Sequence, residues 1–249
     1  MKTVEFSLCY EVNNDSCNAK IAAVIMCAGS SSRMLGVDKQ LEKIGGIEVA
    51  IRSMLAFQRN ENISAIVVAA HKNNMNVLQN LIDKYNVTKV TDIVEGGASR
   101  EESVQNAVNC LDDSFDFVLV HDGARPLVNQ TVINNVINGT VLHNATVCAV
   151  GVKDTIKEVS GESEVVGTVN RSSVVAVQTP QGFSCKILKE ALNRVNDCLS
   201  VFTDDSAVVE HSGQRVFVVP GDYRNIKITT AEDLLIAKTF YEEYSDEYI

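Results

Sequence analysis

Short apolar runs alternate with longer amphipathic segments along most of this chain. The runs at 21–27, 63–70 and 115–121 are almost continuously hydrophobic, which is typical of strands covered on both faces of a parallel sheet. The other expected strands are at 87–94, 145–150, 174–178 and 215–220. We therefore expect a central sheet with its middle strands buried.

The segments between these strands carry apolar residues at helical spacing. Val104, Ala107 and Val108, for example, would lie on one face of a helix. Helices are expected at 48–58, 75–85, 100–111, 130–141, 184–196, 204–212 and from about 230 onward. Because strand–helix alternation implies right-handed crossover connections, the sequence predicts an α/β fold with a doubly wound, mostly parallel sheet.

Two regions depart from this alternation. Residues 151–173 are charged, valine-rich and without a helical stripe, which indicates an extended β-arm that leaves the main body. Residues 3–12 alternate apolar and polar positions, which is typical of a half-buried strand. We interpret 1–19 as an N-terminal extension with this extra strand, and 1–249 as a single domain, since no repeat or linker divides it.

Composition narrows the class of protein. The 249 residues are 45% hydrophobic and 22% charged, as in soluble globular chains. No apolar stretch approaches the roughly 20 residues of a membrane span, and the N-terminus does not resemble a secretory signal. The formal charge of −10 argues against nucleic acid or anionic membranes as partners. Seven cysteines without a C-x-x-C pair indicate free thiols and a cytoplasmic location.

The stretch "CAGSSSRMLGVDKQ" at 27–40 follows the first strand. In α/β proteins a turn at this place binds phosphate through backbone N–H groups. Neither the G-x-G-x-x-G fingerprint nor a P-loop is present. The backbone of 28–32, Arg33 and Lys39 are therefore candidate phosphate contacts. A solvated turn with two surface cations remains the alternative.

The motif "VLVHDGARP" places Asp122 at the carboxyl end of a central strand. Ligand sites of open α/β sheets lie at that edge. A carboxylate beside phosphate groups is a natural Mg²⁺ ligand, which we favour over the alternative that Asp122 caps the next turn. We assign His121 a structural role.

The motif "EGGASREES" has two glycines after the third strand. Gly96 and Gly97 permit close backbone approach to a flat group such as a nucleobase. The alternative is a helix start with Ser99 as N-cap and Glu102 at the third helical position. The two interpretations are compatible.

The motif "NIKIT" at 225–229 alternates polar and apolar residues. Read as a strand, it places Lys227 between Asn225 and Thr229 on one face. An inward-facing lysine is costly unless it meets an anion, so Lys227 is a candidate anion contact. An edge strand with its polar face in water is the alternative.

Taken together, these motifs carry a family resemblance. The ordered set is "CAGSSSRM…DKQ", "EGG…R..S", "VLVHDGARP", "KDTIK", "TVNR", "QTPQGF", "FTDDSAVVE" and "NIKIT..EDL". Over roughly residues 20–240 it resembles the 2-C-methyl-D-erythritol 4-phosphate cytidylyltransferases of the non-mevalonate isoprenoid pathway. The resemblance implies a Rossmann-like nucleotidyltransferase fold and transfer of CMP from CTP to the polyol phosphate, with release of pyrophosphate.

The resemblance also implies roles for individual residues. Arg33 and Lys39 would stabilise the α-phosphoryl group, and Asp122 would hold Mg²⁺ or another divalent cation. Arg171 and Lys227 would orient the attacking phosphate, with the polyol substrate contacted by Thr155, Thr203 and Arg125. The residues that would hold CTP are Ala28, Gly29, Ser30, Ser31, Gly97 and Ser103. In family members the arm crosses to a partner, so the resemblance implies a homodimer in which Arg171 acts across the interface.

Two alternatives share this fold. A D-ribitol-5-phosphate cytidylyltransferase would use the same nucleotide, the same metal and most of the motifs. A catalytically silent nucleotide-binding homologue is also compatible with Ser31 and Ala98, which stand where the family has a glycine and an acidic residue. The presence of five residues favours an enzyme: Arg33, Lys39, Asp122, Arg171 and Lys227.

Overall fold

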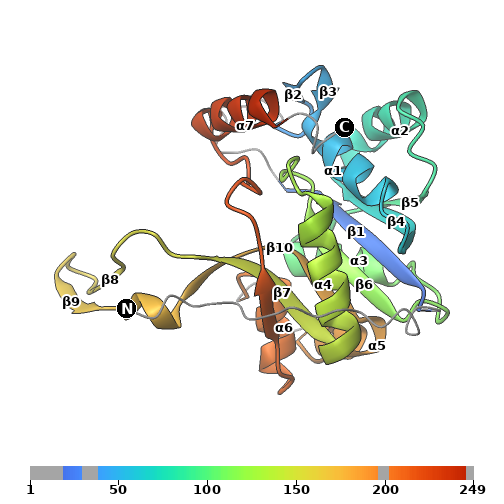
Figure 1. The fold of residues 1–249 in the computed structure, drawn as a ribbon. Helices are drawn as coiled ribbons and strands as arrows, with labels where there is room; N and C mark the ends of the chain where they lie inside the picture. The colour runs from blue at the N-terminus through green and yellow to red at the C-terminus, as the bar shows by residue number, and fades with distance from the viewer. Residues whose placement is uncertain (1–18, 30–38, 196–201, 245–249) are drawn as a thin grey trace.

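The computed structural model describes residues 19–29, 39–195 and 202–244. Its main sheet has seven strands (Figure 1). From one edge to the other these are β11 (Phe217–Pro220), β7 (Ala145–Gly151), β10 (Val175–Ser184), β6 (Phe117–Asp122), β1 (Ile21–Cys27), β4 (Ile63–Ala70) and β5 (Val90–Glu95). The strand predicted at 3–12 lies outside the described residues.

Most neighbouring strands of this sheet run parallel. The exception is β10, which is antiparallel to both β6 and β7. Every residue of β1 is buried, since helices cover both faces of the sheet. The predicted α/β class and mostly parallel sheet are confirmed. The sequence expected β10 to end at 178, but it continues to Ser184 and pairs in the opposite direction.

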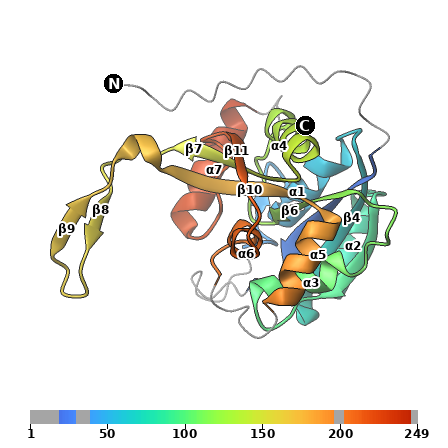
Figure 2. The same ribbon diagram turned by 90° about the horizontal axis from the view of Figure 1, so that it is seen from below.

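The helices divide between the two faces of the sheet. One face packs against α1 (Val49–Gln58), α2 (Met75–Lys84) and α4 (Gln130–His143), and the other against α3 (Arg100–Val108), α5 (Cys185–Arg194) and α6 (Asp205–His211). Figure 2 shows α3 and α5 side by side. Alternate residues of β1 serve the two layers: Ile21 and Ile25 point to the first, Ala22 and Val24 to the second.

A third, smaller core lies beside the main sheet. The last helix, α7 (Ala231–Glu243), packs on a small hairpin of β2 (Lys43–Ile44) and β3 (Ile47–Glu48). Ile44, Leu127, Ile228 and Leu234 are buried between them. The sequence pattern did not predict this hairpin, because two residues are too few to show a period. Among the described helices, none is long and apolar enough to cross a bilayer.

Residues 151–173 form an arm that leaves the body. It carries a hairpin of β8 (Lys157–Val159) and β9 (Val165–Thr168) and a 3₁₀ turn at Arg171–Ser173. Outside the arm, a second 3₁₀ turn, Lys72–Asn74, precedes α2 in the main body. Figure 2 shows the hairpin standing clear of the sheet. The side chains of Val159, Val165 and Val166 are each more than half exposed on it.

Candidate active site

Four parallel strands end at the same edge of the sheet. Because β6, β1, β4 and β5 are neighbours, the residues that follow them are brought together. Ala28 and Gly29 follow β1, His71 follows β4, and Gly97 comes two residues after β5. With Asp122 at the end of β6, they line a cavity of about 420 Å³. Lys39 also lines this cavity, which we call the larger cavity.

The N-terminus of α3 forms one wall of the larger cavity. Ser99 caps the helix, with its Oγ accepting a hydrogen bond from the Glu102 N–H at 3.1 Å. The Glu102 carboxylate accepts from the Ala98 N–H at 2.6 Å, and not from the N–H of the cap residue. The predicted N-cap is confirmed, although the reciprocal bond of a capping box is displaced by one residue.

Gly96 and Gly97, which precede α3, have different surroundings. The Gly97 N–H donates to Ser103 Oγ at 2.9 Å, and that hydroxyl donates to the Ser99 carbonyl at 2.8 Å. A Cβ on Gly96 would overlap the Cβ of Ala28. The two loops can approach closely only because position 96 has no side chain. The wall therefore presents mainly backbone and small side chains.

Three cations surround the carboxylate of Asp122. Lys227 Nζ lies 2.9 Å from Oδ2, Arg125 Nε lies 3.4 Å from the same oxygen, and an Nη2 of Arg100 lies 3.6 Å from Oδ1. Burial alone would raise the pKa of Asp122, but these cations, Lys227 foremost, lower it well below its usual range. The carboxylate is therefore ionised and holds the three cations together.

Arg100 is a site residue that the sequence reasoning missed. Its Nη1 lies 2.6 Å from Oδ1 of the fully buried Asp205, the first residue of α6. Burial lowers the pKa of Arg100, but Asp205 and Asp122 raise it above its ordinary value, so it stays charged. One signal was available: a cation on the first turn of a helix is disfavoured by the helix dipole, so Arg100 required a nearby anion.

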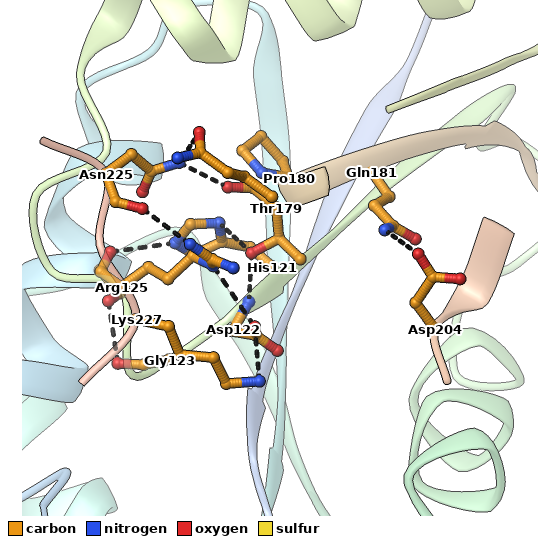
Figure 3. Close-up of polar contacts among 12 residues, drawn as sticks. His121, Asp122, Gly123, Arg125, Thr179, Pro180, Gln181, Asp204, Asn225 and Lys227 are labelled. Atoms are coloured by element: carbon orange, nitrogen blue, oxygen red, sulfur yellow. Dashed lines mark hydrogen bonds and ion pairs between the residues drawn. The ribbon is translucent and has the colours of Figure 1, made fainter. Parts of the chain in front are cut away.

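A second cavity of about 210 Å³ lies on the other side of Asp122. We call it the smaller cavity. Both cavities are lined by Arg100, Asp122 and Lys227, which therefore form the junction between them. Figure 3 shows Lys227 extended toward Asp122 at this junction. The rest of the smaller cavity is lined by Arg125, Val177, Gln178, Thr179, Gln181, Thr203 and Asp204.

The segment 225–229 reaches the junction without being a strand, so the sequence expectation was wrong. Its polar backbone groups bond to the "HDGARP" loop and not to a sheet edge. The Ile228 N–H donates to the Ala124 carbonyl at 2.9 Å, and Arg125 Nη1 donates to the Asn225 carbonyl at 2.7 Å. These bonds place Lys227 beside Asp122.

His121 is buried directly behind the junction. Burial lowers its pKa to about 4, so the ring is neutral at physiological pH. It packs against the ring of Phe57, with centroids 5.0 Å apart. The ring is fully buried, and His121 is not among the residues that line either cavity.

The structure does not bring every predicted site residue to the cavities. Thr155 and Arg171 are exposed on the arm and line neither cavity. Arg171 Nη1 donates to the Lys153 carbonyl at 2.7 Å. Ser30, Ser31 and Arg33 lie outside the described residues.

Asp122 is the candidate protein ligand for a divalent cation. Within the described part of the chain, no group of three or more His, Cys, Asp or Glu side chains could hold a metal ion. Asp122 alone suits Mg²⁺, which often takes one carboxylate and completes its shell with phosphate oxygens and water. Of the two Asp122 oxygens, Oδ1 lies farther from its neighbouring cation, with Arg100 Nη2 at 3.6 Å. The residues present therefore fit a metal that arrives with a phosphate ligand.

Comparisons with known proteins agree with this geometry. Residues 21–243 match the family model of 2-C-methyl-D-erythritol 4-phosphate cytidylyltransferase (IspD). Relatives of that name from Bacillus mycoides and Geobacillus kaustophilus are 41% and 38% identical, each over 87% of this chain and over 96% and 94% of the relative.

Solved structures give the same result. A 4-diphosphocytidyl-2C-methyl-D-erythritol synthase from Anaerococcus prevotii superposes with a TM-score of 0.81 at 29% identity, over 90% of this chain and 96% of that one. The cytidylyltransferase from Thermus thermophilus gives 0.72 at 26% identity, over 90% and 99%. The chain belongs to the 2-C-methyl-D-erythritol 4-phosphate cytidylyltransferase family.

Proposed function

We propose that the two joined cavities are the substrate sites of this cytidylyltransferase, with CTP in the larger and the polyol phosphate in the smaller. The enzyme transfers CMP from CTP to 2-C-methyl-D-erythritol 4-phosphate in the non-mevalonate pathway. The observation that carries the assignment is the shared wall of Arg100, Asp122 and Lys227. Two substrates that react with each other must meet, and this junction joins the cavities.

The larger cavity suits a nucleotide. Its walls at Gly29, Gly97 and Ala98 are small, so a flat base can approach the backbone closely. The backbone of residues 28–32, which follow β1 in the sequence, would offer N–H groups to the triphosphate. Lys39 in the same cavity would neutralise charge on the α-phosphoryl group, and Arg33 would act with it.

The smaller cavity suits a polyol phosphate because it combines cations with neutral polar groups. Arg125 and Lys227 would hold the attacking phosphate, and Thr203 would bind a hydroxyl. A phosphate monoester is already ionised at neutral pH, so no general base is needed. Catalysis then consists of positioning and charge stabilisation at the phosphorus.

Asp122 has two tasks in this proposal. Its carboxylate orients Lys227 at 2.9 Å and would be the protein ligand of Mg²⁺ or another divalent cation. When bound, such an ion would neutralise phosphate charge. Lys227, which is 40% exposed, remains available to a phosphate at the junction.

We further propose that the protein is a homodimer in which the arm of each copy completes the smaller cavity of the other. The exposed valines of β8 and β9 support this, as does the position of Arg171 and Thr155 away from the cavities of their own chain. Light scattering is expected to give twice the chain mass. A fully active monomer would contradict the exchange of arms.

The substrate assignment is tested by pyrophosphate release. The protein is incubated with CTP, Mg²⁺ and either 2-C-methyl-D-erythritol 4-phosphate or D-ribitol 5-phosphate. Release is expected with the methylerythritol phosphate and should be at least tenfold slower with the ribitol phosphate. A preference for ribitol phosphate would assign the chain to that activity, and no release with either would indicate a silent homologue.

A further inference from the structure

We propose that Gln178, Thr179 and Gln181 are positioning residues. Each of them holds a different loop beside the smaller cavity. We call these three side chains the β10 clamp. The proposal rests on the assignment of the smaller cavity to the polyol phosphate. It concerns the motif "QTPQGF", which the family resemblance contains but to which the proposed mechanism gives no task.

An irregularity in β10 turns the clamp toward one side. Val177 pairs with Ala149 of β7, and the next paired residue of β10 is Gln181, which pairs with Val147. Between these two pairs β10 has three residues and β7 has one. The strand therefore holds two extra residues at this point, which is a β-bulge. In a regular strand Gln178 and Thr179 would face opposite sides, but both line the smaller cavity.

Gln178 holds the loop that leads to Lys227. Its Nε2 donates to the Asp222 carbonyl at 2.8 Å, and its Oε1 accepts from the Asp222 N–H at 3.3 Å. The same oxygen accepts from Asn225 Nδ2 at 3.4 Å, while Asn225 also donates to the Thr179 carbonyl at 2.8 Å. Lys227 follows two residues later, so its approach to the junction depends on this anchor.

Thr179 holds the loop of Asp122 and Arg125. Its Oγ1 accepts from the Asp122 N–H at 3.0 Å and lies 3.2 Å from His121 Nδ1. The hydroxyl hydrogen is thus directed to His121 Nδ1, which leaves the ring proton on Nε2. That nitrogen donates to the Arg125 carbonyl at 3.2 Å. Figure 3 shows this chain of bonds.

Gln181 holds the start of α6. Its Nε2 donates to Asp204 Oδ2 at 2.8 Å, and its Oε1 accepts from the Ser206 N–H at 3.0 Å. Asp204 is the N-cap of α6 and lines the smaller cavity beside Thr203. Gln181 therefore holds the α6 end of the smaller cavity, and Figure 3 shows its contact with Asp204.

The hydrogen bonds identify the clamp as positioning rather than catalytic. Both ends of the amides of Gln178 and Gln181 are engaged with protein groups, and the single hydroxyl hydrogen of Thr179 is directed to His121. Each residue reaches a different loop, and these loops are far apart in the sequence. Removing one bond should therefore misplace one wall and leave the others unchanged. A misplacement of about 1 Å can lower a rate substantially.

The test uses full-length variants with matched controls. Gln181→Met and Thr179→Val remove the polar contacts and keep similar volumes. Gln58→Met and Thr146→Val are the controls: Gln58 also bonds through both ends of its amide, and Thr146 carries a buried hydroxyl without a partner among the described residues. KM for each substrate, kcat and the melting temperature are measured for all four.

Gln181→Met is expected to raise KM for the polyol phosphate about tenfold and to leave KM for CTP within twofold. Thr179→Val is expected to lower kcat about tenfold, and Thr179→Ser should restore it to within threefold. Both controls should match the wild type. If Gln181→Met does not fold, the milder Gln181→Asn replaces it, and Thr179→Ala, which also removes the hydroxyl, replaces Thr179→Val; both should shift the same constants in the same direction.

Folded variants with wild-type constants would overturn the clamp, as would equal rises in KM for both substrates. A wild-type protein that releases no pyrophosphate would instead overturn the proposed function. The two failures are therefore distinguishable.

Discussion

The two cavities of the candidate active site are built in different ways. The larger cavity is formed mainly by loops that follow four parallel strands, and Gly29, Gly97 and Ala98 make part of its wall small. The smaller cavity is formed around the antiparallel strand β10, and its walls are long polar side chains that hold distant loops. One site follows from strand topology, whereas the other depends on a network of side-chain contacts.

This difference predicts different sensitivities to substitution. In the larger cavity a new side chain should act by occupying space, whereas in the smaller cavity a lost polar group should act by releasing a loop. The junction should be the most sensitive place, because it serves both cavities.

The largest effect is expected at the junction. Lys227→Met should lower kcat by about 100-fold or more, since one lost contact to developing charge typically costs that much. Lys84→Met is the control, because Lys84 pairs with Glu48 away from both cavities. Pyrophosphate release measures kcat for both. A loss below tenfold would contradict the role of Lys227 as a cation that serves both cavities.

In the stretch 27–40, Lys39→Ala and Arg33→Ala should each lower kcat by about 100-fold with little change in melting temperature. Near-wild-type turnover in either variant would contradict the assignment of the larger cavity to the triphosphate.

A second effect concerns the stability that the Arg100–Asp205 ion pair contributes. Arg100→Met leaves Asp205 buried without its cation, which should cost about 3 kcal/mol of unfolding free energy. Adding Asp205→Leu should recover most of that loss, because the buried charge is then removed. Denaturant unfolding measures both. If the double variant were as unstable as the sum of its single variants, the pair would not act as a unit.

A smaller effect is expected at Gly96, which lies against Ala28 in the wall of the larger cavity. Gly96→Ala introduces a Cβ that would overlap Ala28, so the two loops must separate. KM for CTP should rise about tenfold, while KM for the polyol phosphate stays within twofold. Gly161→Ala, on the arm with open space around it, is the control. Equal changes for both substrates would mean that the cavities are not separate.

The smallest effect is a pH dependence of stability at the start of α7. Asp233 accepts hydrogen bonds from the N–H groups of Thr229 and Thr230 at 2.8 and 2.9 Å. Burial raises its pKa, but the hydrogen bond from the Thr229 hydroxyl, at 2.6 Å, and these N–H bonds lower it by more, so that it lies below the ordinary value. The bonds should therefore stabilise the protein at neutral pH and lose that contribution as pH falls below about 4.

Comparison with Asp233→Asn measures this contribution. The wild type should be about 1 kcal/mol more stable at pH 7, and the difference should shrink as pH falls toward 3. A difference that stays constant with pH would contradict the role of the charge.

The sequence determined the parallel strands of the main sheet and the sheet edge at which the larger cavity lies. The apolar run of β1 showed a strand buried on both faces, and Asp122 marked the carboxyl end of β6. Since parallel strands end at one edge, Gly97 and Ala28 could be expected beside Asp122 without any knowledge of side-chain contacts. Local pattern was sufficient because each of these positions is fixed by its own strand.

Only the tertiary structure decided which residues form the smaller cavity and that Arg100 pairs with Asp205. Arg100 bonds to Asp205 across 105 residues, and Thr179 bonds to the Asp122 N–H across 57. Lys227 was identified by its charge, but its position depends on a loop bond to Ala124 and not on a strand. A hydrogen bond between distant loops leaves no period in the sequence, because each partner satisfies the same local pattern whether or not the other is near.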